Sequence, residues 1–327
     1  AQAIQDHVAA GPGARRATAQ GYFTDEDQLD AYLRDARASS TRRVSQVSDA
    51  HALVDAYLTR RATVWPHIEI ATCAQQIKDR CSNHRLFQQG NLNLCGPASF
   101  LHMWAGRDPV GYARYAVGML EHGQGRIGAL TIPATAALEA MQYPRIGRPS
   151  TMTTPAADFV CMAPLRSDAN AILPYDPTSG MEGLAGATTP GELAGWLRAT
   201  GAFSTVHDEG NWMTIAGIDH AVGLTVGPES DIALLLNVNA LAGAAQVTAI
   251  ETPNTPITNP MTPDRSFFLN LFPNHFVTLL SGIVTDLGRT TLSLSIWTWG
   301  GSYHFAGVPI RSFSENYYGA VKTYMRS

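Results

Sequence analysis

Residues 88–104 read QQGNLNLCGPASFLHMW, and the interpretation of the whole chain starts from this stretch. It joins a turn rich in Asn, Gln and Gly to an apolar segment, and Pro97 is tolerated there because it falls in the first turn of a helix. Cys95 therefore stands where a helix begins. The positive end of the helix dipole lowers the pKa of a thiol and favours the thiolate. The stretch predicts a nucleophilic cysteine.

Two neighbours of Cys95 fit the same chemistry. Gly96 carries no side chain, which leaves room for a substrate carbonyl beside the sulfur. Gln89 lies six residues before the cysteine, and its side-chain amide can donate to an oxyanion together with the Cys95 backbone N–H. If the register differs by one residue, Gln88 takes that place.

The pattern QG-x4-C followed by Gly at a helix start resembles the nucleophile segment of papain-like cysteine peptidases. The string CGPA is also similar to bacteriocin-processing peptidases and to bacterial papain-fold toxins and effectors. This resemblance implies that Cys95 is the nucleophile and that Gln89 completes the oxyanion hole. It also implies a catalytic histidine at the start of a late strand.

PNHFVTLL places His275 at such a strand start, 180 residues after Cys95. The following strand ends in WTWGG, similar to the Trp-Gly region that follows the third catalytic residue in papain relatives. His275 is therefore predicted to be the general base. His220, in GIDHAVGLTV, is the alternative, although no hairpin with a Trp-Gly end follows it.

The residue that orients the histidine departs from the family pattern. Relatives use an Asn or Asp whose oxygen accepts from the histidine Nδ1–H, and residues 288–314 contain neither. A hydroxyl, a backbone carbonyl or a distant carboxylate can accept the same bond, and a dyad needs none. The side-chain candidates are Thr298, which strand alternation favours, Ser295, Asp219 and Asp176.

The charge and composition of the chain exclude some classes of partner. The 327 residues carry a net charge of −4, with 15% charged and 45% hydrophobic residues. Lys and Arg are scattered, so we expect no nucleic-acid partner. No apolar run reaches the roughly 20 residues of a membrane span. The chain begins without Met or a signal peptide, so we expect a processed product or a piece of a longer protein.

The other three cysteines are expected to be structural. Cys73, Cys81 and Cys161 form no Cys-x-x-Cys pair, so we expect no metal and no cofactor. If the residues between Cys73 and Cys81 form a helix, the two sulfurs lie too far apart for a disulfide; if they form a loop, a disulfide is open. Cys161 falls in an apolar run, residues 158–163, that reads as a strand.

The order of elements predicts an α+β fold of papain-like type, in which a helical half carries Cys95 and an antiparallel sheet carries His275. Residues 1–80 are expected to form a linker and a helical extension, and residues 81–327 the catalytic domain. Helices are predicted over 24–37, 45–62, 95–104, 108–123, 189–201 and 308–325, strands over 158–163 and 231–241 and in a hairpin over 275–300, and a helix–helix connection over 122–128.

The predicted function is that of a cysteine-nucleophile hydrolase acting on amide bonds of a protein or peptide. The resemblance to toxin and effector domains implies secretion or delivery into a target cell, with a cognate inhibitor or immunity protein as a partner. A glutamine deamidase or acyl transferase would share the acyl-enzyme, so both stay open. An inactive papain-like binding domain is the alternative from another class, and the absence of the orienting Asn or Asp favours it.

Overall fold

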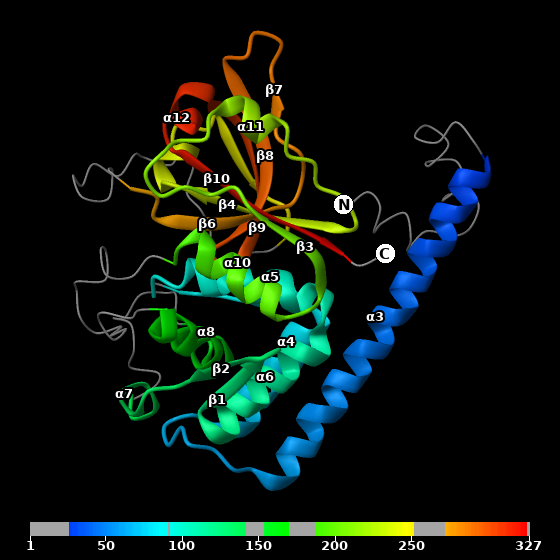
Figure 1. The fold of residues 1–327 in the computed structure, drawn as a ribbon, viewed down its shortest axis with the longest axis vertical. Coiled ribbons are helices and arrows are strands. Elements are labelled where there is room, and N and C mark those ends of the chain that lie inside the picture. Colours follow the sequence, from blue (N-terminus) through cyan, green and yellow to red (C-terminus); the bar gives the residue numbers. More distant parts are fainter. Residues whose placement is uncertain (1–25, 91, 142–153, 170–187, 252–271, 326–327) are drawn as a thin grey trace.

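Helices dominate the chain up to Ala199 and strands dominate after it, which confirms the α+β class (Figure 1). The computed structural model describes residues 26–90, 92–141, 154–169, 188–251 and 272–325, with side chains from residue 41 onward. The expected linker at the N-terminus and Asp176 lie outside these residues. The helices of the first part are α3 (Glu26–Arg60), α4 (Ile70–Ser82), η1 (His84–Leu86), α5 (Cys95–Arg107), α6 (Pro109–His122), α7 (Ala136–Glu139), α8 (Ala156–Ala169) and α10 (Pro190–Ala199).

The ends of the helices follow the residues that cap them. Asp108 accepts a hydrogen bond from Gly111 N and precedes Pro109, the first residue of α6. Gly123 ends α6 in the left-handed conformation, with a φ of 64°. Thr189 forms a capping box with Glu192 at the start of α10. These helices begin and end close to where the sequence predicted.

The main sheet is antiparallel throughout, with the strand order β3-β10-β4-β6-β8-β9-β5 and β7 paired with β8. Its strands and the short helices between them are β3 (Phe203–Asp208), α11 (Ile218–Val222), β4 (Ser230–Leu236), η2 (Val238–Leu241), β5 (Gln246–Ala249), β6 (His275–Leu279), β7 (Val284–Thr285), β8 (Thr291–Thr298), β9 (Gly301–Pro309), α12 (Ile310–Ser314) and β10 (Tyr317–Met325). The predicted hairpin thus appears as β6, β7 and β8.

Each face of the sheet covers a separate core. Phe276 and Trp297 face the helical half and share a cluster with the buried residues of α4, α5, α6 and α8. Their sequence neighbours Val277 and Ile296 face the opposite way and pack with α11 and α12. This alternation is the two-residue period of β-strands. Helix α5 lies against the sheet on the Phe276 side (Figure 1), so its N-terminus reaches the start of β6.

The N-terminal helices share the core of the helical half. Ala50, Val54 and Tyr57 of α3 are completely buried in the same cluster as α5. The two helices predicted over 24–37 and 45–62 are one helix, α3. The residues between them contain no Gly or Pro, so nothing there ends a helix. Within the described residues, no helix is both long and apolar enough to cross a membrane.

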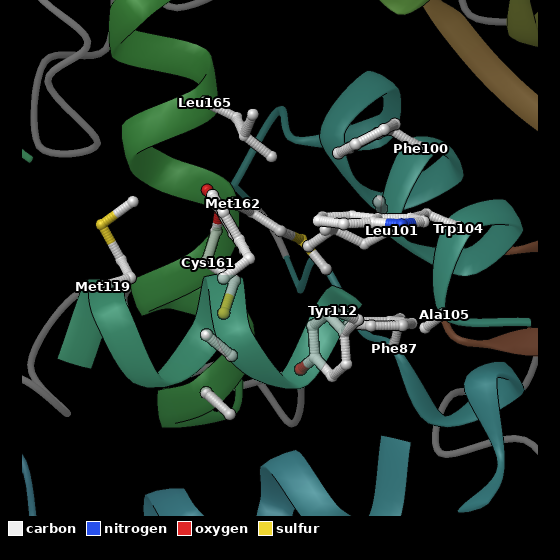
Figure 2. Packing of buried hydrophobic residues seen from close by; sticks show 14 of the residues in the cluster. Phe87, Phe100, Leu101, Trp104, Ala105, Tyr112, Met119, Cys161, Met162 and Leu165 are labelled. Atoms are coloured by element: carbon white, nitrogen blue, oxygen red, sulfur yellow. The ribbon is translucent and has the colours of Figure 1, made fainter. Parts of the chain in front are cut away.

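The segment 158–163 is a helix, and the predicted strand is wrong. It lies inside α8, where all residues from Ala156 to Arg166 are buried. Figure 2 shows Cys161 among side chains of α5 and α6, with Met119 and Tyr112 close by. A segment buried on all sides has no amphipathic period, so a short apolar run cannot separate helix from strand.

Two further predictions are wrong. Residues 317–325 form β10, not a helix, and this strand is paired on both sides, with β3 and β4. Its Tyr, Val and Thr residues are typical of strands. Residues 124–127 form β1 (Gln124–Ile127), which pairs with β2 (Leu130–Pro133) around a turn at Gly128, where we expected a helix–helix connection.

Cys73 and Cys81 both lie on α4, and both are free, buried thiols. The prediction that a helix between them keeps them reduced is confirmed. Burial raises the pKa of each thiol to about 12, so neither is a nucleophile at neutral pH.

Candidate active site

Cys95 is the first residue of α5, as predicted from Pro97 and the preceding turn. Leu94 occupies the N-cap, and its side chain does not bond the N–H groups of the first turn. The next ten residues, Gly96 to Ala105, are all buried. The thiol is therefore fixed to the end of a rigid, fully packed element.

The sulfur of Cys95 contacts the start of β6. Its Sγ donates to the carbonyl of Asn274 over 3.8 Å. Burial raises the pKa of the thiol, although the Phe276 N–H and the charge of Arg166 act to lower it. The expectation of a lowered pKa is therefore wrong for this state, because desolvation outweighs the helix end and its neighbours. The sulfur therefore contacts backbone groups of the residue before His275 and of the residue after it.

Gly96 is required by packing, and our explanation for it was incomplete. A Cβ atom at this position would lie 2.3 Å from the Cβ of Thr188. Thr188 is buried and directly precedes the N-cap of α10. The missing side chain thus lets the α10 start pack against the first turn of α5.

His275 opens β6 and is 4% exposed. Its Nε2 lies 2.6 Å from Thr298 Oγ1, and its ring stacks on Trp299 with centroids 4.5 Å apart and planes inclined by 15°. Burial lowers the pKa of His275 to about 3. Among the described residues the imidazole makes no hydrogen bond to the Cys95 thiol. Both groups are therefore neutral at physiological pH, and Nδ1 is the nitrogen that Thr298 leaves free.

Thr298 is the residue that contacts the histidine, out of the four side chains that the sequence left open. It bonds Nε2, whereas the sequence analysis expected the bond at Nδ1. Ser295 instead lies 3.0 Å from His304 Nδ1. Asp219 is exposed and pairs with Arg289. Neither of these two is bound to the imidazole.

His220 lies elsewhere in the fold. It belongs to α11, not to a strand, and α11 packs on the face of the sheet opposite α5. Its Nδ1 lies 2.7 Å from the hydroxyl of Tyr317, and its Nε2 lies 2.8 Å from Glu209. Both ring nitrogens therefore have partners away from Cys95.

The tip of the β8–β9 hairpin is strained. Trp299 and Gly300 form the two-residue connection, with φ values of 48° and 76°. A type I′ turn requires positive φ at both positions, which suits Gly and costs energy at Trp. The two glycines after Trp299 are a sequence signal of this tight turn. The residue with this strained backbone is the one whose indole stacks on His275.

The loop that carries Gln89 packs against this hairpin tip. A Cβ on Gly300 would lie 3.0 Å from the Gln88 Cγ and 3.2 Å from the Phe87 carbonyl oxygen. Trp297 Nε1 donates to the carbonyl of Arg85 over 3.0 Å. The sequence separation exceeds 200 residues, so only the fold brings these segments together.

Gln89 is buried to 8% exposure. Its carbonyl accepts from Thr154 Oγ1 over 2.7 Å and from Leu92 N over 3.3 Å. Its side-chain amide makes no hydrogen bond to the described residues. The backbone of this residue is thus fixed while its amide stays uncommitted, as a donor to a bound group requires.

The remaining titratable residues offer no metal site in the part of the chain described here, because no three His, Cys, Asp or Glu residues gather closely enough to hold an ion. His102 packs inside the helical half, stacked on Trp297 with ring centroids 4.2 Å apart. Comparison of the chain with protein-family models, with curated proteins and with solved structures found no match.

Proposed function

We propose that this protein is a papain-like thiol hydrolase that attacks amide bonds of a protein or peptide with Cys95. The proposal rests on one observation: the sulfur of a helix-terminal cysteine contacts the carbonyl of the residue before His275, while Thr298 and Trp299 hold that histidine. Order along the chain and element type agree with a thiol–imidazole pair, and the sulfur contacts the backbone next to His275.

The proton transfer starts from a neutral pair. In the resting protein, a histidine with a pKa of about 3 does not take a proton from a thiol whose pKa is raised. The proton therefore moves as the sulfur attacks the carbonyl, and no thiolate–imidazolium pair is formed beforehand. No hydrogen bond joins Cys95 and His275 in this structure, so the proposal requires a side-chain movement that brings the S–H group from the Asn274 carbonyl to Nδ1 of His275. The 3.8 Å contact with Asn274 is weak and opposes this movement little.

The subsequent steps use the same residues. The tetrahedral oxyanion accepts hydrogen bonds from the Cys95 backbone N–H and the Gln89 amide. His275 returns its proton to the leaving amine, the C–N bond breaks, and an acyl group stays on the sulfur. Water then adds to the acyl carbon and releases the acid. If ammonia leaves from a glutamine, or another nucleophile replaces water, the same pair performs deamidation or acyl transfer.

The binding-domain alternative has its own support. Thr298 offers a neutral hydroxyl where papain relatives have an amide or carboxylate, so it stabilises an imidazolium less. A neutral pair, in which His275 is buried and Cys95 is half-buried, is also compatible with a domain that has lost catalysis. The two functions differ in one measurable property, the formation of an acyl-enzyme.

Acylation by p-nitrophenyl acetate tests the proposal without knowledge of the natural substrate. We expect a burst of p-nitrophenolate and an acetyl group on Cys95 in the mass spectrum of the wild-type protein. Cys95→Ala and His275→Ala should remove the burst, while His220→Ala should keep it as the matched histidine control. If the wild type gives no burst that depends on Cys95, the hydrolase proposal fails.

Iodoacetamide separates Cys95 from the three structural thiols. Cys161 is completely buried and its pKa is raised well above the ordinary value, as for Cys73 and Cys81. In the native protein, iodoacetamide should alkylate Cys95. The other three cysteines should react only after denaturation. If Cys95 in the native protein is as unreactive as the other three cysteines, it is a structural thiol and not a nucleophile.

Delivery into a target cell and a cognate inhibitor are part of the same proposal. Intracellular expression of the wild-type chain should then slow growth, and expression of Cys95→Ala should not. If both proteins inhibit growth, the toxicity does not depend on the Cys95 thiol, and this part of the proposal is wrong.

A further inference from the structure

A buried ion pair lies directly behind the loop that carries Gln89. Arg80 of α4 donates from Nε and Nη2 to the two carboxylate oxygens of Asp158 in α8, over 2.6 and 2.7 Å. Asp158 is completely buried and Arg80 is 4% exposed. A carboxylate without solvent needs several donors to stay ionised, and this bidentate pair supplies two of them.

The third donor comes from the loop itself. The backbone N–H of Gln88 donates to Asp158 Oδ2 over 2.9 Å, across 70 residues of sequence. The next residue is held as well, because Thr154 donates to the Gln89 carbonyl over 2.7 Å. Two consecutive loop residues are thus bound to groups at the beginning of α8 and just before it.

Helices α4 and α8, which carry Arg80 and Asp158, are also bonded to each other. Gln76, one turn before Arg80 on α4, accepts from the Ala157 N–H over 3.0 Å and so caps the first turn of α8. Its own carbonyl accepts from Arg80 Nη1 over 3.1 Å. Helices α4 and α8 are therefore joined by polar bonds at the level of the loop.

From these contacts we propose that Asp158, held by Arg80, is a positioning residue for the oxyanion side of the site. It fixes the backbone at Gln88 so that the amide of Gln89 keeps a constant place relative to the Cys95 sulfur. This inference rests on the proposed function. A buried ion pair contributes little net stability compared with apolar residues of similar volume, so its stronger effect is to hold an acceptor at a defined point.

The test compares two reactions of the same thiol. Acylation by p-nitrophenyl acetate passes through an oxyanion, whereas alkylation by iodoacetamide displaces iodide and forms none. The ratio of the two rate constants therefore reports on the oxyanion donors and cancels changes in thiol exposure or ionisation. For Asp158→Asn we expect this ratio to fall by about 10- to 100-fold, because a donor displaced by about 1 Å loses most of its effect.

Asp231→Asn is the matched control. Asp231 also forms a bidentate pair with an arginine, Arg107, and its carboxylate has no hydrogen bond to the described residues of the Gln89 loop. We expect its ratio to stay within twofold of the wild type. If Asp231→Asn lowers the ratio as much as Asp158→Asn does, the effect is a general loss of stability and the inference is wrong.

Thr154→Val gives a second, uncharged variant in case Asp158→Asn does not fold. It removes the hydroxyl bond to the Gln89 carbonyl, and we expect the ratio to fall several-fold. A ratio within twofold of the wild type in Asp158→Asn overturns the inference, and Thr154→Val decides in the same way if Asp158→Asn is unfolded. Failure of the hydrolase proposal itself is distinguishable, because it appears as an absent burst in the wild type.

Discussion

The indole of Trp299 lies nearly parallel to the imidazole of His275, with ring centroids 4.5 Å apart and planes inclined by 15°. Trp299 reaches this place only with a φ of 48°, a conformation that costs a residue with a side chain roughly 1–2 kcal/mol. The strain persists because the stack removes water from one face of the imidazole and from its bond to Thr298. The low pKa of the histidine follows from that burial.

Trp299→Gly and Trp299→Ala should both raise the pKa of His275 from about 3 toward the unburied value of about 6.5. The titration of the His275 ring proton by NMR measures this shift. Trp299→Gly should be more stable than Trp299→Ala by about 1 kcal/mol, because Gly adopts positive φ without cost. An unchanged pKa in both variants would show that the indole does not set the environment of the ring.

Arg289→Gly is the control for backbone strain alone. Arg289 also has a positive φ, 49°, but its side chain is exposed and pairs with Asp219. The substitution should relieve strain without changing the pKa of His275.

Thr298→Val should slow acylation of Cys95 by p-nitrophenyl acetate about 5- to 10-fold. The variant keeps the side-chain shape and removes one hydrogen bond of about 1 kcal/mol to His275 Nε2. Thr298→Asn restores an acceptor and should recover the rate. Ser295→Ala is the control, since it removes only the contact with His304. A rate in Thr298→Val equal to that of the wild type would mean that the pair works without an orienting residue.

Acidification should destabilise the protein below about pH 6.5. Three histidines have lowered pKa values, mainly through loss of solvent: His84, which is half-buried, and His275 at about 3, and His102 well below its ordinary value. Between about pH 3 and pH 6.5 the unfolded chain therefore binds up to three protons that the folded chain does not. Stability rises with pH in this window, with a slope of at most about 4 kcal/mol per pH unit.

His102→Phe isolates one of these protons. The ring keeps its stack on Trp297 and no longer titrates, so the slope of unfolding free energy against pH should fall by about one third. Urea unfolding at pH 5 and pH 7 measures the slope. Equal slopes in wild type and His102→Phe would contradict the burial of a neutral histidine.

Local signals predicted the elements that carry the candidate site. Pro97 and the preceding turn predicted the start of α5, and the alternation of apolar residues after Leu292 favoured Thr298 among the four candidates for the residue that contacts the histidine. Such signals come from neighbours in sequence, where capping and strand period act. The helix at 158–163 and the strand at 317–325 lacked them, because both segments are buried on more than one side.

Two features of the candidate site depend on contacts between distant residues and could not be predicted from the sequence. The raised pKa of Cys95 results from packing around the thiol, and a helix end alone predicts the opposite shift. The role of Asp158 depends on Arg80 and Gln88, which lie 78 and 70 residues away. Neither position stands in a recognisable motif, so only the fold reveals the contact.

Gln89→Ala decides most directly between an enzyme and a binding domain. An oxyanion donor stabilises charge that exists only in the transition state, so its removal should lower kcat by about 10²–10³ and leave KM nearly unchanged. Alkylation of Cys95 by iodoacetamide should proceed at the wild-type rate, because no oxyanion forms. Gln88→Ala is the matched neighbour, and its side chain packs on Gly300. If Gln88→Ala loses acylation and Gln89→Ala keeps it, the donor is one residue earlier. If the wild type acylates nothing and a partner protein binds Cys95→Ala as tightly as the wild type, the binding-domain function replaces the hydrolase.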